Sequence, residues 1–108
     1  MGKRLGQHFL SSPRTAQRIA RCAAIQTDDV VLEIGPGTGI LTKELLATDA
    51  TVIAVEKDEM LAEKLRIKFG KNDNFILIES DIRDVLKRKK SFTLESVKVV
   101  ANIPYYLS

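Results

Sequence analysis

Three glycines at alternating positions, Gly35, Gly37 and Gly39, directly follow an apolar run over residues 30–34. Glycine adopts positive φ angles at little cost and lets a backbone approach a ligand closely. Residues 40–47 are expected to form a helix, whose free N–H groups and positive dipole end would point at the same place. A nucleotide-like ligand fits this arrangement. The alternative is a tight turn without a ligand, although such a turn rarely needs three glycines.

The spacing of the glycines excludes two common nucleotide-binding loops. The dinucleotide fingerprint G-x-G-x-x-G requires its last glycine at position 40, which is Ile40 here. A phosphate-binding P-loop requires Lys-Ser or Lys-Thr after the last glycine, and neither pair follows. The pattern E-x-G-x-G-x-G, from Glu33 to Gly39, instead resembles the S-adenosylmethionine loop of Rossmann-like methyltransferases.

Acidic residues stand at the ends of two further strand-like runs. Glu56 lies 21 positions after Gly35, where an acid can accept hydrogen bonds from both ribose hydroxyls of a nucleotide. Asp81 is placed to accept from an adenine amino group, with Ile82 against the ring. The simpler interpretations are a surface carboxylate for Glu56 and a helix cap for Asp81. Glu33 either orients the glycine loop, meets an ammonium group of the ligand or is only a strand-end acid.

The elements that must position these residues alternate along the chain. Strands are predicted at residues 30–34, 51–56, 75–79 and 97–101, and helices at 13–24, 40–47, 59–69 and 82–86. This alternation predicts an α/β fold with a parallel sheet and helices on both faces. Because ligands of such sheets bind beyond the carboxyl ends of the strands, the glycine loop, Glu56 and Asp81 are expected to meet there.

The first predicted helix begins at Ser12-Pro13, since serine is a good N-cap and proline fits the first helical position. Its apolar face is expected to consist of Ala16, Ile19, Ala20, Ala23 and Ala24. Three arginines lie outside that face, at positions 14, 18 and 21. They are either a solvated surface or contacts to RNA phosphates. The same two alternatives hold for the basic run 87–90.

The composition is that of one small soluble domain. The chain has 108 residues, of which 44% are hydrophobic and 29% charged, and its net charge of +3 permits a nucleic-acid partner without requiring one. One cysteine, Cys22, excludes an internal disulfide, fits a reducing cytoplasm and is expected to be a buried helical residue. No apolar stretch approaches the roughly 18 residues of a membrane span.

Two terminal segments carry the most specific pattern. Asn102-Ile103-Pro104-Tyr105 resembles the N-[IL]-P-[YF] motif of methyltransferases that act on exocyclic amines of nucleobases. The segment Lys3–Leu10 resembles the N-terminal arm of the ribosomal RNA adenine N6-dimethyltransferase family, and within it the small-subunit enzymes most closely. The motifs extend over essentially all 108 residues and occur in the family's order.

This resemblance implies a Rossmann-like class I methyltransferase fold, S-adenosylmethionine as cofactor and ribosomal RNA, or a small-subunit precursor, as partner. It implies cofactor contacts from His8, Leu10, Gly35, Gly37, Glu56, Asp81, Ile82 and Asn102. No metal, no membrane, a cytoplasmic location and a monomeric full-length protein are expected. The chain is then the N-terminal portion of the domain, truncated after the fourth strand, and it is expected to retain part of the cofactor site yet lack turnover.

The same resemblance assigns catalytic roles to Asn102, Pro104 and Tyr105. The side-chain carbonyl of Asn102 and the backbone carbonyl of Pro104 would accept both N–H hydrogens of the adenine amine. Its lone pair would then point at the sulfonium methyl group. Tyr105 would stack on the flipped-out base, which is worth about 1–3 kcal/mol in single-stranded binding. The alternative for this segment is a turn with a packed tyrosine.

Three classes of function follow. The first is the small-subunit RNA methyltransferase, with the large-subunit enzymes of the erythromycin-resistance type as the closest variant. The second is a non-catalytic remnant that binds cofactor or RNA. The third is a nucleotide-dependent oxidoreductase on the same fold, against which the Asn102–Tyr105 segment argues.

Overall fold

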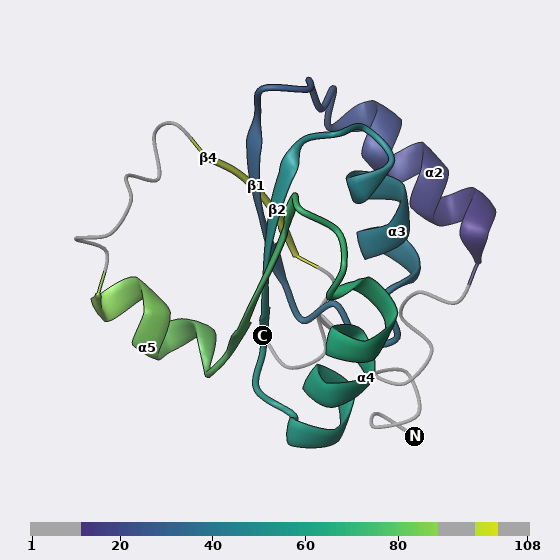
Figure 1. Ribbon diagram of the computed structural model, residues 1–108. Helices are drawn as coiled ribbons and strands as arrows, with labels where there is room; N and C mark the ends of the chain where they lie inside the picture. Colours follow the sequence, from purple (N-terminus) through teal and green to yellow (C-terminus); the bar gives the residue numbers. More distant parts are fainter. Residues whose placement is uncertain (1–11, 89–96, 102–108) are drawn as a thin grey trace, which may run out of the picture.

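The computed structural model describes residues 12–88 and 97–101, and these form a three-layer α/β arrangement (Figure 1). The strands are β1 (Val30–Ile34), β2 (Thr51–Glu56), β3 (Phe75–Glu79) and β4 (Val97–Ala101). The helices are α2 (Pro13–Cys22), α3 (Ile40–Leu46), α4 (Glu59–Phe69) and α5 (Ile82–Lys87). All four strands have the predicted bounds, because each is an apolar, largely β-branched run that ends at a polar residue or glycine.

The strands form one parallel sheet in the order β3-β2-β1-β4. This confirms the predicted parallel α/β fold. β1 lies between β2 and β4, with Ile34 in register with Val55 on one side and Ala101 on the other. Since the strands are parallel, their carboxyl ends share one edge of the sheet, which we call the carboxyl edge.

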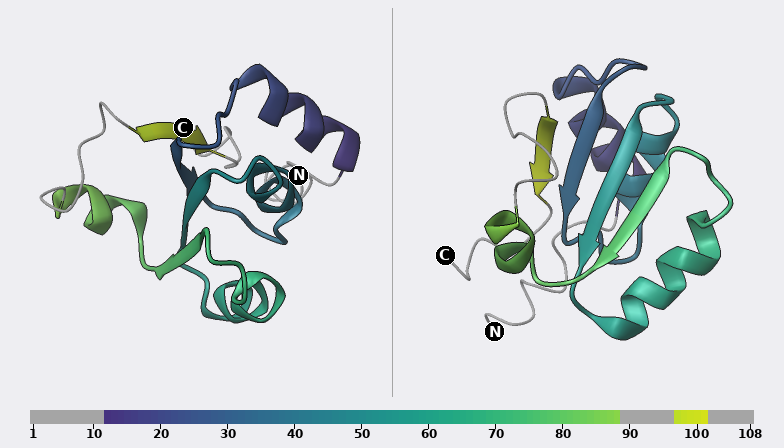
Figure 2. Two further views of the ribbon diagram at one scale, coloured as in Figure 1. Left: turned by 45° about the horizontal axis from the view of Figure 1, so that its top comes forward. Right: turned by 60° about the vertical axis from the view of Figure 1, so that its left-hand side comes forward.

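Helices cover both faces of the sheet, but unequally. α2, α3 and α4 pack on one face, where the main core includes Val31, Leu45, Val52 and Leu65. α5 lies on the other face, as the left view of Figure 2 shows. Its Val85 packs there with Leu32 and Val55 in a smaller cluster.

Helix ends differ slightly from the sequence prediction. α2 ends at Cys22 rather than near Ala24, because Ala24 adopts a φ of +52°, which no helix continues. Cys22 is exposed, so its predicted burial is wrong. Ser12 caps α2 as predicted, accepting a hydrogen bond from the N–H of Thr15. Asp58 caps α4 in the same way, accepting from the N–H of Leu61.

Candidate ligand site at the carboxyl edge of the sheet

The glycine loop leaves β1 with three left-handed residues. Gly35, Gly37 and Gly39 have φ angles of 68°, 59° and 90°, so each position favours glycine. The N–H of Gly35 donates to Val55 O at 3.0 Å, which attaches the start of the loop to the end of β2. A Cβ on Gly39 would approach the Phe69 ring to 2.7 Å. The third glycine is therefore required for close packing of the loop on α4.

Glu56, the last residue of β2, holds the loop in place. Its Oε1 accepts from the N–H of Gly37 at 3.2 Å, and its Oε2 accepts from the N–H of Asp58 at 2.9 Å. The side chain is only 5% exposed, so both bonds are sheltered from water. Among the described residues each carboxylate oxygen accepts one hydrogen bond, which leaves a further lone pair for a ligand donor. Glu56 is thus not the surface carboxylate of the simpler interpretation.

Glu33 lies beneath the loop and does not reach the surface. Its Oε1 accepts from the Thr42 hydroxyl of α3 at 2.6 Å, which connects β1 to the helix after the loop. Its Oε2 is buried and has no hydrogen-bond partner among the described residues. Burial raises the pKa of Glu33 to about 7, the negative charge of Glu56 adds to this, and the Thr42 hydrogen bond opposes it. This arrangement supports the loop-orienting role.

Asp81 has the structural role that the simpler interpretation assigned to it. Its Oδ1 accepts from the Arg83 N–H at 2.8 Å and caps α5, and its Oδ2 pairs with the Arg83 guanidinium at 2.9 Å. These hydrogen bonds to Arg83 hold the pKa of Asp81 well below its usual range. The carboxyl group is consequently ionised at neutral pH and remains an acceptor.

These residues line one cleft. An open cleft of about 490 Å³ at the carboxyl edge is bounded by Gly35, Glu56, Asp81 and Ile82. Four of the predicted cofactor residues, from three different strand ends, are thereby brought together. Gly37 does not line the cleft but is fixed by Glu56, which does. This is the convergence expected at the carboxyl ends of parallel strands.

The remaining predicted site residues, His8, Leu10, Asn102, Pro104 and Tyr105, lie outside the described residues. β4 nevertheless ends at Ala101 beside Ile34, the residue that precedes Gly35. The carboxyl end of β4 therefore lies at the edge that carries the cleft.

Several contributors to the site were not predicted from the sequence. Lys57 and Arg83 also line the cleft, and Thr42 holds Glu33. Lys68 of α4 donates to Thr38 O of the loop at 3.1 Å. Only Thr42 had a sequence signal, since it is a polar residue between Leu41 and Leu45 on the inward face of a short helix.

Neither a metal site nor a membrane span is found in the part of the chain that the structure describes. Residues 12–88 and 97–101 contain no group of three His, Cys, Asp or Glu side chains that could hold a metal ion. No helix in these ranges is long and apolar enough to cross a membrane.

The family model described as ribosomal RNA adenine dimethylase matches residues 1–108, the whole chain. The chain belongs to this family. A curated member of similar sequence, ribosomal RNA small subunit methyltransferase A of Synechocystis sp., is 47% identical over 98% of this chain and 42% of its own length. The chain spans about 40% of the length of the curated relatives that it matches.

Solved structures agree with this assignment to the ribosomal RNA adenine dimethylase family. A dimethyladenosine transferase from Plasmodium falciparum is 31% identical, with a TM-score of 0.71 over 92% of this chain and 34% of its own. The 23S rRNA methyltransferase ErmE is 39% identical, with a TM-score of 0.63 over 68% of this chain and 30% of its own. The predicted Rossmann-like class I methyltransferase fold is confirmed.

Proposed function

We propose that this chain carries the cofactor-binding part of an S-adenosylmethionine-dependent methyltransferase that dimethylates the N6 amine of adenines in small-subunit ribosomal RNA. The observation that carries the proposal is the cleft at the carboxyl edge. There a left-handed glycine loop, the sheltered carboxylate of Glu56 and the ionised Asp81 converge. Family membership supplies the reaction class.

The residues of the cleft fit S-adenosylmethionine. The carboxylate oxygens of Glu56 can accept hydrogen bonds from ribose hydroxyls, and Asp81 with Ile82 suits an adenine ring. When bound, this cofactor supplies a methyl group on a positively charged sulfur. The two acids of the cleft, Glu56 and Asp81, are matched by the two bases Lys57 and Arg83, so the net charge of the lining does not select between cofactors.

For the target amine we assign Asn102, Pro104 and Tyr105, which the family motif places directly after β4. Asn102 and Pro104 would accept the two N–H hydrogens of the adenine amine, and Tyr105 would stack on the base. Positioning of the amine for in-line transfer is the whole task of these groups, with no covalent intermediate on the protein. We expect the full-length protein to be a cytoplasmic monomer.

The cofactor proposal is tested by equilibrium dialysis of the chain against S-adenosylmethionine and, separately, against NADH. Saturable binding of S-adenosylmethionine alone is expected. Binding of NADH in its place would favour the oxidoreductase alternative and contradict the proposal. Binding of neither ligand by a folded chain would show that this cleft alone is not a cofactor site.

The reaction is tested with the protein at its relatives' full length. Tritiated S-adenosylmethionine is incubated with small- and large-subunit particles, and the labelled nucleosides are separated by chromatography. Label in N6,N6-dimethyladenosine of the small subunit is expected. Label confined to large-subunit RNA would assign the protein to the ErmE-like activity instead, and label on another base would refute adenine specificity.

A further inference from the structure

Positive charge is concentrated at the start of this chain. Five basic residues and no acidic residue precede Asp28, whereas the remaining residues include twelve basic and fourteen acidic ones. The net charge of +3 therefore arises entirely from the first quarter of the sequence. Of the residues there that the structure describes, the charged ones are all arginines, and all lie on α2. An unequal distribution of this kind marks a surface that attracts anions.

α2 separates its arginines from its packing face. Ala16 and Ala20 are buried against the main core, with Ile19 and Ala23 partly buried beside them. Arg14, Arg18 and Arg21 follow each other at spacings of four and three residues, which is one stripe of a helix. Arg14 and Arg18 are each two residues from Ala16, about 200° around the helix, whereas Arg21 follows Ala20 directly, about 100° away. All three arginines are exposed. We call these three side chains the arginine face.

Among the described residues, the arginine face has no ionic partner. Arg66 pairs with Glu63 and Glu79, and Arg83 pairs with Asp81. By contrast, no ion pair or hydrogen bond of the guanidinium groups at positions 14, 18 and 21 is found among the described residues. A solvated helix usually intersperses both charges, as α4 does with Glu63 and Arg66. The difference indicates that the counter-charge of α2 comes from another molecule.

The structure fixes α2 firmly as a support for these side chains. Ser12 caps its first turn, and Lys98 of β4 donates to Ala23 O at 3.3 Å and Ala24 O at 2.6 Å at its other end. Lys98 is itself held by Asp29 at 2.9 Å. Arg14 and Arg21 are seven positions apart, so the arginine face extends for about 10 Å along the helix, the scale of a few nucleotides of one strand.

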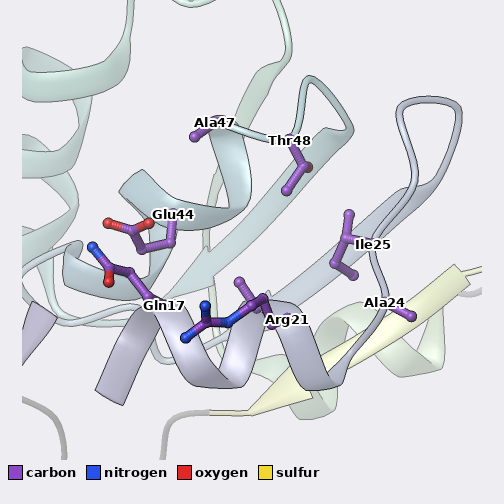
Figure 3. Close-up of a pocket in the computed structure, with 8 residues that line it drawn as sticks. Gln17, Arg21, Ala24, Ile25, Glu44, Ala47 and Thr48 are labelled. Carbon is purple, nitrogen blue, oxygen red and sulfur yellow. The ribbon is translucent and has the colours of Figure 1, made fainter. Parts of the chain in front are cut away.

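A groove between α2 and α3 borders the arginine face on one side. Gln17 and Arg21 border it from α2, and Glu44 borders it from α3, as Figure 3 shows. Glu44 lies beside Gln17 in Figure 3 and forms no ion pair with Arg21 in the described part of the chain. Because Glu44 shares this groove with Arg21, its negative charge weakens the attraction of an anion to the neighbouring part of the arginine face.

We propose that the arginine face binds the phosphate backbone of the RNA substrate, an inference that rests on the function proposed above. Arginine suits this role because its planar guanidinium donates two parallel hydrogen bonds to a phosphate. Contacts of this kind orient an RNA without selecting its sequence. The face thus positions the RNA, while the base is selected at the carboxyl edge.

The test measures RNA affinity against salt. A fluorescein-labelled RNA hairpin is titrated with the chain by fluorescence polarisation at several salt concentrations. In the triple variant Arg14→Gln, Arg18→Gln, Arg21→Gln, we expect at least a tenfold loss of affinity at low salt. The slope of log K against log salt should fall by about 2–3, since each neutralised phosphate contributes about 0.7–0.9. Glu44→Gln should strengthen binding by about twofold.

The matched control removes the same charge elsewhere. Lys43, Lys64 and Lys71 are exposed and have no ion pair in the described ranges, so Lys43→Gln, Lys64→Gln, Lys71→Gln should leave the salt slope nearly unchanged. Equal losses in the two triple variants would mean that only net charge matters and would overturn the proposal. The proposal would also be overturned if the arginine variant kept its RNA affinity but lost binding to phosphatidylglycerol vesicles.

Cofactor binding separates this inference from the function on which it rests. The arginine variant should bind S-adenosylmethionine like the wild-type chain, because the arginines do not line the cleft. Failure of the wild-type chain to bind the cofactor would count against the proposed function. If the arginine variant binds the cofactor normally and its RNA salt slope is unaltered, the result would count against the arginine face alone.

Discussion

The carboxyl edge and the arginine face differ in how their charged side chains are held: two glutamates at the edge are buried and hydrogen-bonded, and the arginines on the face are exposed. At the carboxyl edge, Glu33 and Glu56 are buried, and backbone N–H groups or a hydroxyl hold them in one geometry. On α2 the arginines are exposed and unpaired within the described chain. Buried, bonded charges keep their strength in salt, whereas exposed ones are screened within about 10 Å. The first region is therefore preformed for a small ligand, and the second depends on a large partner that supplies many charges.

The largest effect that would test this comparison is a loss of stability at the loop. Gly39→Ala forces a side chain into φ +90° and against Phe69 and Leu65, so the free energy of unfolding should fall by about 3 kcal/mol. Urea unfolding measures this. In the double variant Gly39→Ala, Phe69→Leu, the loss of unfolding free energy should be smaller than the sum of the two single losses, because the smaller side chain leaves room for the new methyl group. A loss under about 1 kcal/mol would mean that the loop is not tightly packed.

Glu33 should make the stability of the protein depend on pH. Its pKa is raised from 4.5 to about 7 in the folded protein, so the folded state binds more protons than the unfolded state between these values. Stability is therefore lost as the pH rises from 4.5 to 7, by up to roughly 3 kcal/mol, and it changes no further above that.

The variant Glu33→Gln keeps the acceptor for Thr42 and cannot ionise. Relative to wild type, its free energy of unfolding should rise between pH 4.5 and 7 and level off above pH 7. Urea unfolding across this range gives the difference curve, with the exposed Glu63→Gln as a control. A flat difference curve would contradict the burial argument for Glu33.

A smaller effect is expected where β4 secures the end of α2. Lys98→Met removes the hydrogen bonds to Ala23 O and Ala24 O and the ion pair with Asp29. Because Lys98 is 39% exposed, the loss should be only about 1 kcal/mol. Lys64→Met on α4 is the control and should be near neutral. Cofactor affinity should not change in either variant, since neither residue lines the cleft. A change of cofactor affinity in Lys98→Met would show that the end of α2 and the cleft are energetically coupled.

Much of the fold follows from local patterns. Val30 to Ile34 and Thr51 to Glu56 are apolar runs closed by glycine or acid, so both bounds and burial were predictable. Asp58 and Ser12 carry cap signals that need only three residues to act. The end of α2 was missed because Ala24, which has no turn signal, takes a positive φ.

For the described part of the site, the sequence predicted where Glu56 and Asp81 lie but not what their side chains contact. Sequence spacing placed Glu56 and Asp81 at strand ends, and the cleft confirms that position. That Glu56 clamps Gly37, or that Arg83 occupies both oxygens of Asp81, depends on side-chain directions that spacing does not determine. The bond from Lys98 to Ala23 joins residues 75 apart and depends on the strand order of the finished sheet.

The central claim, that the cleft beside Glu56 binds S-adenosylmethionine, is tested most directly by calorimetry. The cofactor is titrated into the wild-type chain, into Glu56→Gln and into Glu79→Gln, whose carboxylate ends the neighbouring strand and pairs with Arg66 at the surface. Thermal unfolding confirms that all three are folded. We predict one saturable site, weakened about 10–100-fold by Glu56→Gln because a charged acceptor is lost, and unaffected by Glu79→Gln. Equal affinity in the Glu56 variant, or no binding by the folded wild-type chain, would contradict the account.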